Sequence, residues 1–173
     1  MLSAPLKRRP CEWLLANISN KDGTTLANAK RYMMIEWEGI KIGIVGLIEE
    51  EWIDTLTIDD ALDYTDFVVA GHDFAQRMKD EGAEVLIALT HMRLQNDQLL
   101  AAKCPEYDLI LGGHDHFTHV QAFDQRWLLK SGTEFRNMGE IKVDWNSHHI
   151  EARMLDIDGD IVEDPRVVEI IAT

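Results

Sequence analysis

The sequence contains little of what would place it in several common classes of protein. It has two cysteines in 173 residues, and no apolar run approaches the roughly 20 residues of a membrane-spanning helix. Cys11 and Cys104 alone cannot make a disulfide framework or a zinc cluster, so we expect both to be small buried hydrophobic residues. The apolar run 13–16 is too short for the core of a signal peptide. A cytoplasmic location is the default expectation.

Clustered positive charge is scarce as well. Lys and Arg total 17 against 31 Asp and Glu, which gives a formal net charge of −14. Because binding to a phosphate backbone needs grouped basic side chains, this balance argues against a nucleic-acid partner. We interpret the single compact basic run, residues 7–9, as a solvated tail. The apolar and charged fractions, 46% and 28%, indicate a soluble globular domain with a core of ordinary size.

The first half of the chain has several apolar runs of strand length. Residues 12–18, 32–37 and 40–47 predict strands. Between the last two, Glu38 and Gly39 are typical of a hairpin turn, because glycine readily adopts the positive φ that such a turn needs. The run 40–47 is almost continuously apolar, which is typical of a strand buried on both faces.

A βαβ unit is expected at about residues 84–116. Residues 84–89 predict a buried strand, and Asn96 or Asp97 can cap the helix that follows it. A second buried strand is expected at 107–111. Strands joined by such a crossover are parallel and are usually neighbours in the sheet.

The segments on either side complete a single α/β domain. Apolar residues at helical spacing predict a helix over 66–81. Residues from about 119 to 157 predict antiparallel strands. A final helix is expected at about 164–172, because Asp164 can cap it and proline follows at its first position.

Three histidines follow the two strands of the βαβ unit. His91 follows the first strand, and the Gly-Gly-His-Asp-His run 112–116 follows the second. Ligands bind at the carboxyl ends of parallel strands, which lie about 4.8 Å apart, so His91 and His114 can converge on one cation. His114 and His116 stand roughly 6.5 Å apart in extended chain, which suits two metals about 3.5–4 Å apart. The pattern predicts a binuclear centre with His91, His114 and His116 as ligands.

Other polar residues near these histidines are not expected to complete the site. Gly112 and Gly113 are interpreted as allowing close approach of the backbone to a ligand. His72 lies in a helical pattern and is interpreted as part of a solvated helix face. Asp97 is expected to serve at its helix start, and Asp108 to face away at the beginning of its strand. Asp115 is expected to alternate away from the two neighbouring histidines.

These features together resemble the calcineurin-like metallophosphoesterases, and among them the 5′-nucleotidase and UDP-sugar hydrolase branch. Segments similar to that branch occur in the expected order at 13–18, 41–47, 89–92, 104–110, 112–116 and 130–136. The resemblance implies a four-layer α/β sandwich with two mixed sheets, of which this chain holds a part. It also implies hydrolysis of phosphate esters at two divalent metals, which can be Mn, Zn, Fe, Co or Mg. In that arrangement His91 and His114 bind one metal and His116 binds the other.

The chain departs from the family pattern near its beginning. The family's Asp-x-His, Gly-Asp-x-x-Asp and Gly-Asn-His-Asp/Glu motifs do not occur in it. In the family these motifs supply the bridging carboxylate, an asparagine ligand and the histidine that protonates the leaving group, so the catalytic residues are unknown. We expect a missing part on the order of one hundred residues before Met1, which could carry a signal peptide. A second, substrate-binding domain is expected to follow the final helix.

Two functions are therefore considered. The first is a metal-dependent phosphoesterase of the 5′-nucleotidase kind, acting on phosphate esters of nucleotides or related compounds and inactive as this truncated chain. The alternative is a non-catalytic fragment or interaction module with at most one weakly bound metal. In both cases fewer than two metals are expected in this chain, and unpaired sheet edges favour self-association.

Overall fold

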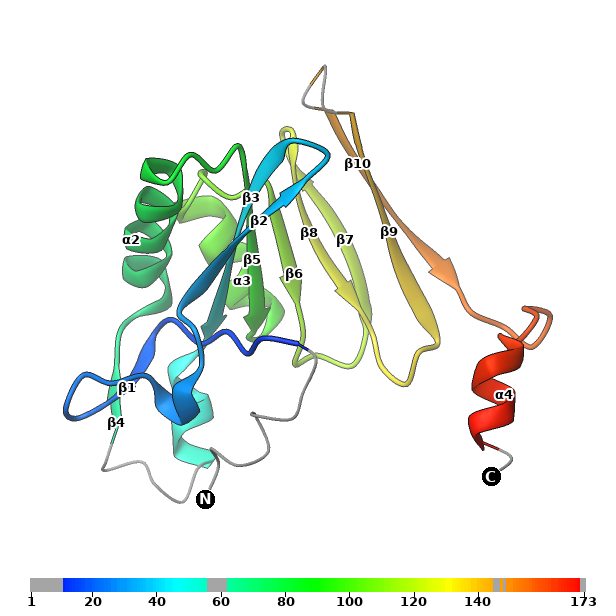
Figure 1. Cartoon of the computed structure of the whole chain (residues 1–173), viewed down its shortest axis with the longest axis horizontal. Coiled ribbons are helices and arrows are strands. Elements are labelled where there is room, and N and C mark those ends of the chain that lie inside the picture. The colour runs from blue at the N-terminus through cyan, green and yellow to red at the C-terminus, as the bar shows by residue number, and fades with distance from the viewer. Residues whose placement is uncertain (1–10, 56–61, 145–146, 148, 172–173) are drawn as a thin grey trace.

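The computed structural model describes residues 11–55, 62–144, 147 and 149–171, so the basic run 7–9 lies outside the described residues. Six strands form the central sheet in the order β2-β3-β5-β6-β8-β7 (Figure 1). Their bounds are β2 (Tyr32–Trp37), β3 (Ile40–Ile48), β5 (Val85–His91), β6 (Leu109–Gly112), β7 (Thr118–Phe123) and β8 (Arg126–Ser131).

The sheet is mixed. Strands β3, β5, β6 and β8 pair in parallel, while β2 and β7 are antiparallel edge strands. The predicted hairpin is present between β2 and β3, and its turn residues Glu38 and Gly39 have φ of 50° and 86°. Two successive positive φ angles are the mark of a type I′ turn, whose twist matches that of the flanking strands. The predicted α/β class is confirmed.

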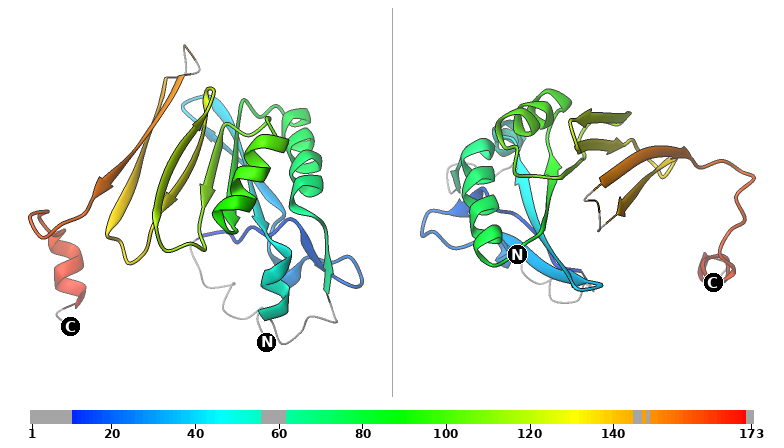
Figure 2. Two further views of the ribbon diagram at one scale, coloured as in Figure 1. Left: turned by 180° about the vertical axis from the view of Figure 1, so that it is seen from behind. Right: turned by 90° about the horizontal axis from the view of Figure 1, so that it is seen from above.

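Two helices cover one face of the sheet, and a second, two-stranded sheet packs against the β7–β8 end of the other face (Figures 1 and 2). The helices are α2 (Phe67–Asp80) and α3 (Leu94–Lys103), and the second sheet is the antiparallel pair β9 (Asn137–Asp144) and β10 (His149–Asp156). Asp66 caps α2, since its side chain accepts hydrogen bonds from the amides of Val68 and Val69. The molecule thus has three layers: helices, sheet and sheet.

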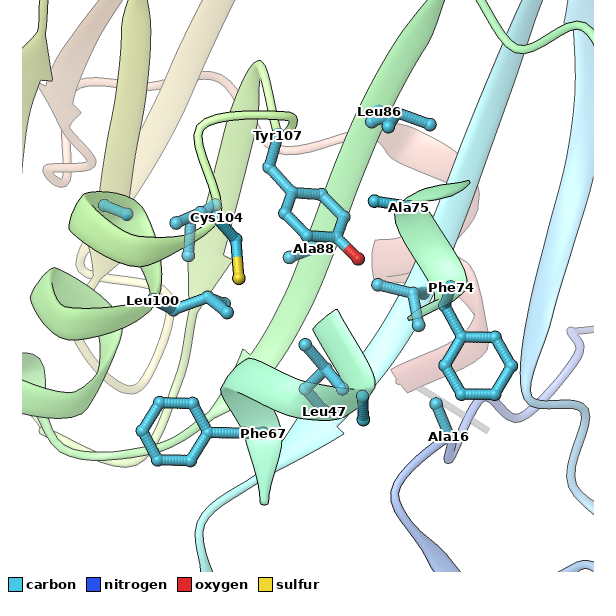
Figure 3. Packing of buried hydrophobic residues seen from close by; sticks show 14 of the residues in the cluster. Ala16, Leu47, Phe67, Phe74, Ala75, Leu86, Ala88, Leu100, Cys104 and Tyr107 are labelled. Carbon is cyan, nitrogen blue, oxygen red and sulfur yellow. The ribbon is translucent and has the colours of Figure 1, made fainter. Parts of the chain in front are cut away.

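Alternation along the strands separates the two cores. In β5, Leu86 and Ala88 face the helices, whereas Ile87 faces the β9–β10 sheet, because successive side chains point to opposite faces. Figure 3 shows the helix-side core, where Tyr107 lies between α2 and α3. Its buried hydroxyl donates to the Gly71 carbonyl at 2.7 Å, which ties the α3–β6 connection to α2.

The remaining elements lie outside these layers. They are β1 (Ile18–Asn20), β4 (Leu62–Tyr64), the short 3₁₀ segments Leu26–Asn28 and Glu50–Thr55, and the helix α4 (Pro165–Ile171). Strand β1 pairs with β4, and α4 lies apart from both sheets with no buried residue (Figure 1). Among the described residues, no helix is both long and apolar enough to cross a bilayer.

Two sequence predictions about local structure were wrong, and a third was incomplete. The run 12–18 is mostly not strand, because the buried Asn17 side chain bonds both backbone groups of Ile48 in place of a continuous ladder. The antiparallel strands predicted at about 119–157 are present as the pairs β7–β8 and β9–β10, but β8 also pairs in parallel with β6, which was not predicted. Cys11 is exposed, although Cys104 is buried as predicted.

Candidate metal centre

His91 and His114 lie together at the carboxyl edge of the parallel strands. His91 is the last residue of β5, and His114 follows β6 by two residues. Their ring centroids are 5.3 Å apart with an interplanar angle of 75°. Two imidazoles that bind one tetrahedral metal at ordinary metal–nitrogen distances have centroids roughly 5 Å apart, so the spacing fits a shared cation.

The two glycines before His114 make room for side chains on both sides of the loop. A Cβ on Gly113 would lie 3.1 Å from His91 Nδ1, and one on Gly112 would lie 2.6 Å from Asp97 Oδ2. The sequence predicted that these glycines leave room for a bound ligand. In the structure, the space beside them is occupied by protein side chains, those of His91 and Asp97. His114 itself has a φ of 72°, a left-handed conformation that histidine adopts more readily than most residues.

A buried lysine organises this loop. Lys130 of β8 is fully buried, and its ammonium donates to the carbonyls of Met92 at 2.8 Å and Gly113 at 2.6 Å. It also donates to the Asp97 carboxylate and forms an ion pair with Asp115 at 3.2 Å. One cation therefore joins the segment after His91 to the loop that carries His114.

Asp97 differs from its predicted role at the start of α3, and Asp115 takes that role. Asp97 does not cap α3, because the helix begins at Leu94 and the Asp97 carboxylate is fully buried against Thr90 and Lys130. Burial raises the pKa of Asp97, and the hydrogen bonds from Lys130 and Thr90 oppose that rise. Asp115 supplies the helix start instead, since its Oδ2 accepts from the Leu94 amide at 2.7 Å. Neither carboxylate is oriented as a metal bridge.

Glu49 belongs to the site although its sequence context did not indicate it. It follows β3, and the β3–β5 register sets Ile48 beside His91, so Glu49 reaches the same edge. Its side chain is only 2% exposed, and Oε1 lies 3.8 Å from His114 Nε2. Burial would raise the pKa of Glu49, but hydrogen bonds from Arg93 and Asn96 hold it below its ordinary value. An ionised carboxylate therefore lies close to His114, though beyond hydrogen-bond distance from its ring.

Trp52 is a further site residue that was not predicted. Its ring contacts both imidazoles, with centroid distances of 4.7 Å to His91 and 6.0 Å to His114. The indole N–H is buried and has no hydrogen-bond partner among the residues that the structure describes. Ligands bind at the carboxyl ends of parallel strands. If the end of β3 had been considered together with those of β5 and β6, this segment would have been indicated, because Glu49 directly follows β3 and Trp52 lies three residues further on.

The electrostatics of His91 favour its neutral form. Loss of water around the ring lowers the pKa of His91, and the neighbouring His114 and Lys130 lower it further. A neutral imidazole is the form that binds metals. His116 is exposed and also lowers the pKa of His91, whereas the 5.3 Å contact between imidazole rings joins His91 to His114. The residues present thus fit one cation between His91 and His114.

The sequence of this chain is similar to parts of several known proteins. No protein-family profile matches the chain. It is 35% identical over 109 residues to the protein 5NUC of Lutzomyia longipalpis and 30% identical over 106 residues to an apyrase of Tabanus yao. It is 31% identical over 86 residues to the trifunctional nucleotide phosphoesterase YfkN of Bacillus subtilis.

The chain is a homologue of the 5′-nucleotidase-type metallophosphoesterases. The family resemblance predicted from the sequence is therefore confirmed. The matched parts cover 60% of this chain for the first two relatives and 49% for the third. They cover only 18%, 19% and 6% of those relatives' own lengths.

Solved structures share the fold of this chain. The 5′-nucleotidase precursor of Thermus thermophilus matches 98% of this chain and 39% of its own, with a TM-score of 0.76 at 16% identity. The calcineurin-like phosphoesterase YfkN of Bacillus subtilis matches 94% of this chain and 61% of its own, with a TM-score of 0.74 at 18% identity. At such identities the likeness establishes the metallophosphoesterase fold alone.

Proposed function

We propose that the chain is part of a metal-dependent phosphoesterase that hydrolyses phosphate esters of nucleotides or related compounds. The observation that carries this proposal is the pairing of His91 and His114 at the strand ends, 5.3 Å apart. Relatives named as an apyrase and a nucleotide phosphoesterase support the substrate class. His116 would supply a ligand to a second metal, and the divalent ion itself is left open among Mn, Zn, Fe, Co and Mg.

Each residue of the centre has a distinct part in this proposal. Bound divalent metal would supply Lewis acidity and would activate water near neutral pH. His91 and His114 would hold the ion as neutral imidazoles, and the ionised Glu49 would add negative charge close to His114. Trp52 would exclude water from one side of both rings. Lys130 would hold the His114 loop in place through the Gly113 carbonyl.

Turnover by these 173 residues alone is not expected. The sequence holds no Asp-x-His, Gly-Asp-x-x-Asp or Gly-Asn-His-Asp/Glu motif, and these are the segments that supply the bridging carboxylate and the proton donor to the leaving group in the family it resembles. The same gap favours the alternative, a non-catalytic module with at most one weakly bound metal. Self-association through the edge strands β2 and β7 stays a prediction.

We expect metal binding to depend on His114. The purified chain, loaded with manganese, should carry fewer than two ions, and His114→Ala should bind at least roughly tenfold more weakly, since ligands matter more than their outer partners. Elemental analysis and titration measure this, alongside hydrolysis of p-nitrophenyl phosphate and AMP. His114→Asn tests the same loss with a residue that tolerates the left-handed φ.

The matched control is His149→Ala, because His149 is exposed at the start of β10, away from the carboxyl ends of the parallel strands β5 and β6. Equal manganese binding by wild type and both His114 variants would refute the proposed centre. Two ions per chain with His114-dependent hydrolysis would refute the alternative and the expected lack of turnover.

We expect Trp52 to report the occupancy of this centre. A paramagnetic ion such as Co²⁺ between His91 and His114 lies within contact range of the Trp52 ring and should quench its fluorescence. The loss should amount to the share of one tryptophan among five. Trp52→Phe should abolish the loss while manganese binding persists. Quenching that survives Trp52→Phe, or that is unchanged in His114→Asn, would contradict this assignment.

A further inference from the structure

A second group of metal-ligating side chains lies away from the histidine centre. His72, Cys104 and Glu106 each offer one ligand atom, and these three atoms all lie within 4.8 Å of one another. His72 comes from α2, and the other two come from the α3–β6 connection. Glu106 precedes β6 whereas His114 follows it, so the two groups lie at opposite ends of that strand.

The group is held together by contacts that do not depend on a metal. His72 Nδ1 and Glu106 Oε1 are 2.9 Å apart, although the sequence pattern indicated only a solvated helix face at His72. The buried Tyr107 hydroxyl fixes the connection to Gly71, next to His72. Gly71 also lets α2 approach the end of α3 closely, because a Cβ there would lie 3.1 Å from Cys104 Sγ. The ligand atoms are therefore brought together by the packing of α2 on α3.

One atom of the group lacks a partner. Glu106 Oε2 is buried and accepts no hydrogen bond from the residues that the structure describes. Burial would raise the pKa of Glu106, but the hydrogen bond from His72 holds it below its ordinary value, so this unpaired oxygen belongs to a carboxylate. A buried, unpaired carboxylate oxygen is costly, and an ion that binds it would remove the cost.

We propose that His72, Cys104 and Glu106 form a binding site for one Zn²⁺ or a similar thiophilic divalent cation. A thiolate and a carboxylate balance two positive charges, and the neutral imidazole adds the third ligand. A mixed sulfur, nitrogen and oxygen set favours zinc over magnesium or calcium. In tetrahedral zinc sites the ligand atoms stand roughly 3.4–3.6 Å apart, so the partly exposed His72 and Glu106 side chains need to shift by up to roughly 1.2–1.4 Å.

Binding involves the loss of one proton from Cys104. Burial raises the pKa of the Cys104 thiol to about 12, so the free group is protonated and unreactive. Metal coordination replaces that proton, which leaves to solvent as the sulfur–metal bond forms. Affinity should therefore rise with pH. The site is independent of the proposed phosphoesterase function, since it shares no residue with the histidine centre.

Cobalt titration of the 173-residue chain tests the proposal, because a cobalt–thiolate bond gives a charge-transfer band in the near ultraviolet. The histidine centre has no sulfur ligand, and the only other thiol is Cys11. We expect the band in wild type, in Cys11→Ser and in a His91→Ala/His114→Ala double variant. We expect it to disappear in Cys104→Ser.

His72→Gln keeps the test valid if the buried Cys104→Ser change impairs folding, since the His72 side chain is 47% exposed. This variant should fold normally and bind Co²⁺ at least about tenfold more weakly. In the wild type, added Zn²⁺ should displace Co²⁺ and so remove the absorption band. The absence of a thiolate band in the folded wild type would overturn the proposal, as would a band that disappears in Cys11→Ser or that His72→Gln leaves unchanged.

Discussion

Lys130→Met is expected to destabilise the protein by about 3–5 kcal/mol. The substitution keeps the volume and the aliphatic stem of the side chain but removes a cation that is fully buried. The carbonyls of Met92 and Gly113 lose their donor, and the Asp97 carboxylate loses its counter-charge. Since domains of this size are stable by only about 5–15 kcal/mol, the loss would be a large fraction of the total. Urea unfolding followed by tryptophan fluorescence measures it.

A double variant separates the charge from the packing. Asp97→Leu combined with Lys130→Met removes both members of the buried pair, and apolar replacement of such pairs is often neutral. The double variant should therefore recover part of the stability that Lys130→Met loses, although two carbonyls stay unpaired. Lys142→Met on β9 is the matched control, because that side chain is 64% exposed and should change little. A Lys130→Met variant within about 1 kcal/mol of wild type would contradict this account.

Gly46→Ala is expected to cost about 3 kcal/mol or more. Gly46 lies in β3, and a Cβ there would stand 2.4 Å from the carbonyl oxygen of Leu14 and 2.6 Å from its carbonyl carbon. Those atoms are backbone, and the adjacent Ala16 amide donates to the Gly46 carbonyl at 2.8 Å. The methyl group can be accommodated only if the segment 14–16 moves away from the sheet, which breaks this hydrogen bond.

Gly43→Ala in the same strand provides the comparison. There the nearest atom to an added Cβ is Met78 Sδ at 2.7 Å, the flexible part of an unbranched side chain that adapts readily. We expect a cost of about 1 kcal/mol, clearly smaller than that of Gly46→Ala. Thermal and urea unfolding of the two variants side by side measures the difference. Equal costs would mean that the Leu14 segment does not constrain β3 as the structure indicates.

Local sequence patterns predicted the elements that depend on neighbouring residues. The hairpin at Glu38-Gly39 follows from turn chemistry and the helix over 66–81 from the spacing of apolar residues, and both are present. The strand-end rule correctly brought His91 beside His114. Metal binding by these histidines stays a prediction.

Contacts between distant segments could not be predicted in the same way. Nothing near Lys130 in the sequence indicates that its ammonium is buried, because its partners are 15 to 38 residues away. Glu49 lies in a run of three glutamates that resembles a solvated segment, and only the pairing of β3 with β5 brings it to the histidines. The order of strands in the sheet was the missing information, and it depends on tertiary packing.

The position of Lys130 in the chain also sets a sequence of events. During synthesis both histidines leave the ribosome before Lys130 does, and until β8 docks against β6 the His114 loop has no ammonium to anchor its carbonyl. Contacts over such separations close late in folding. A nascent chain that ends before β8 would therefore present its imidazoles on a loose loop, and it would acquire a defined cation site only when that strand is added.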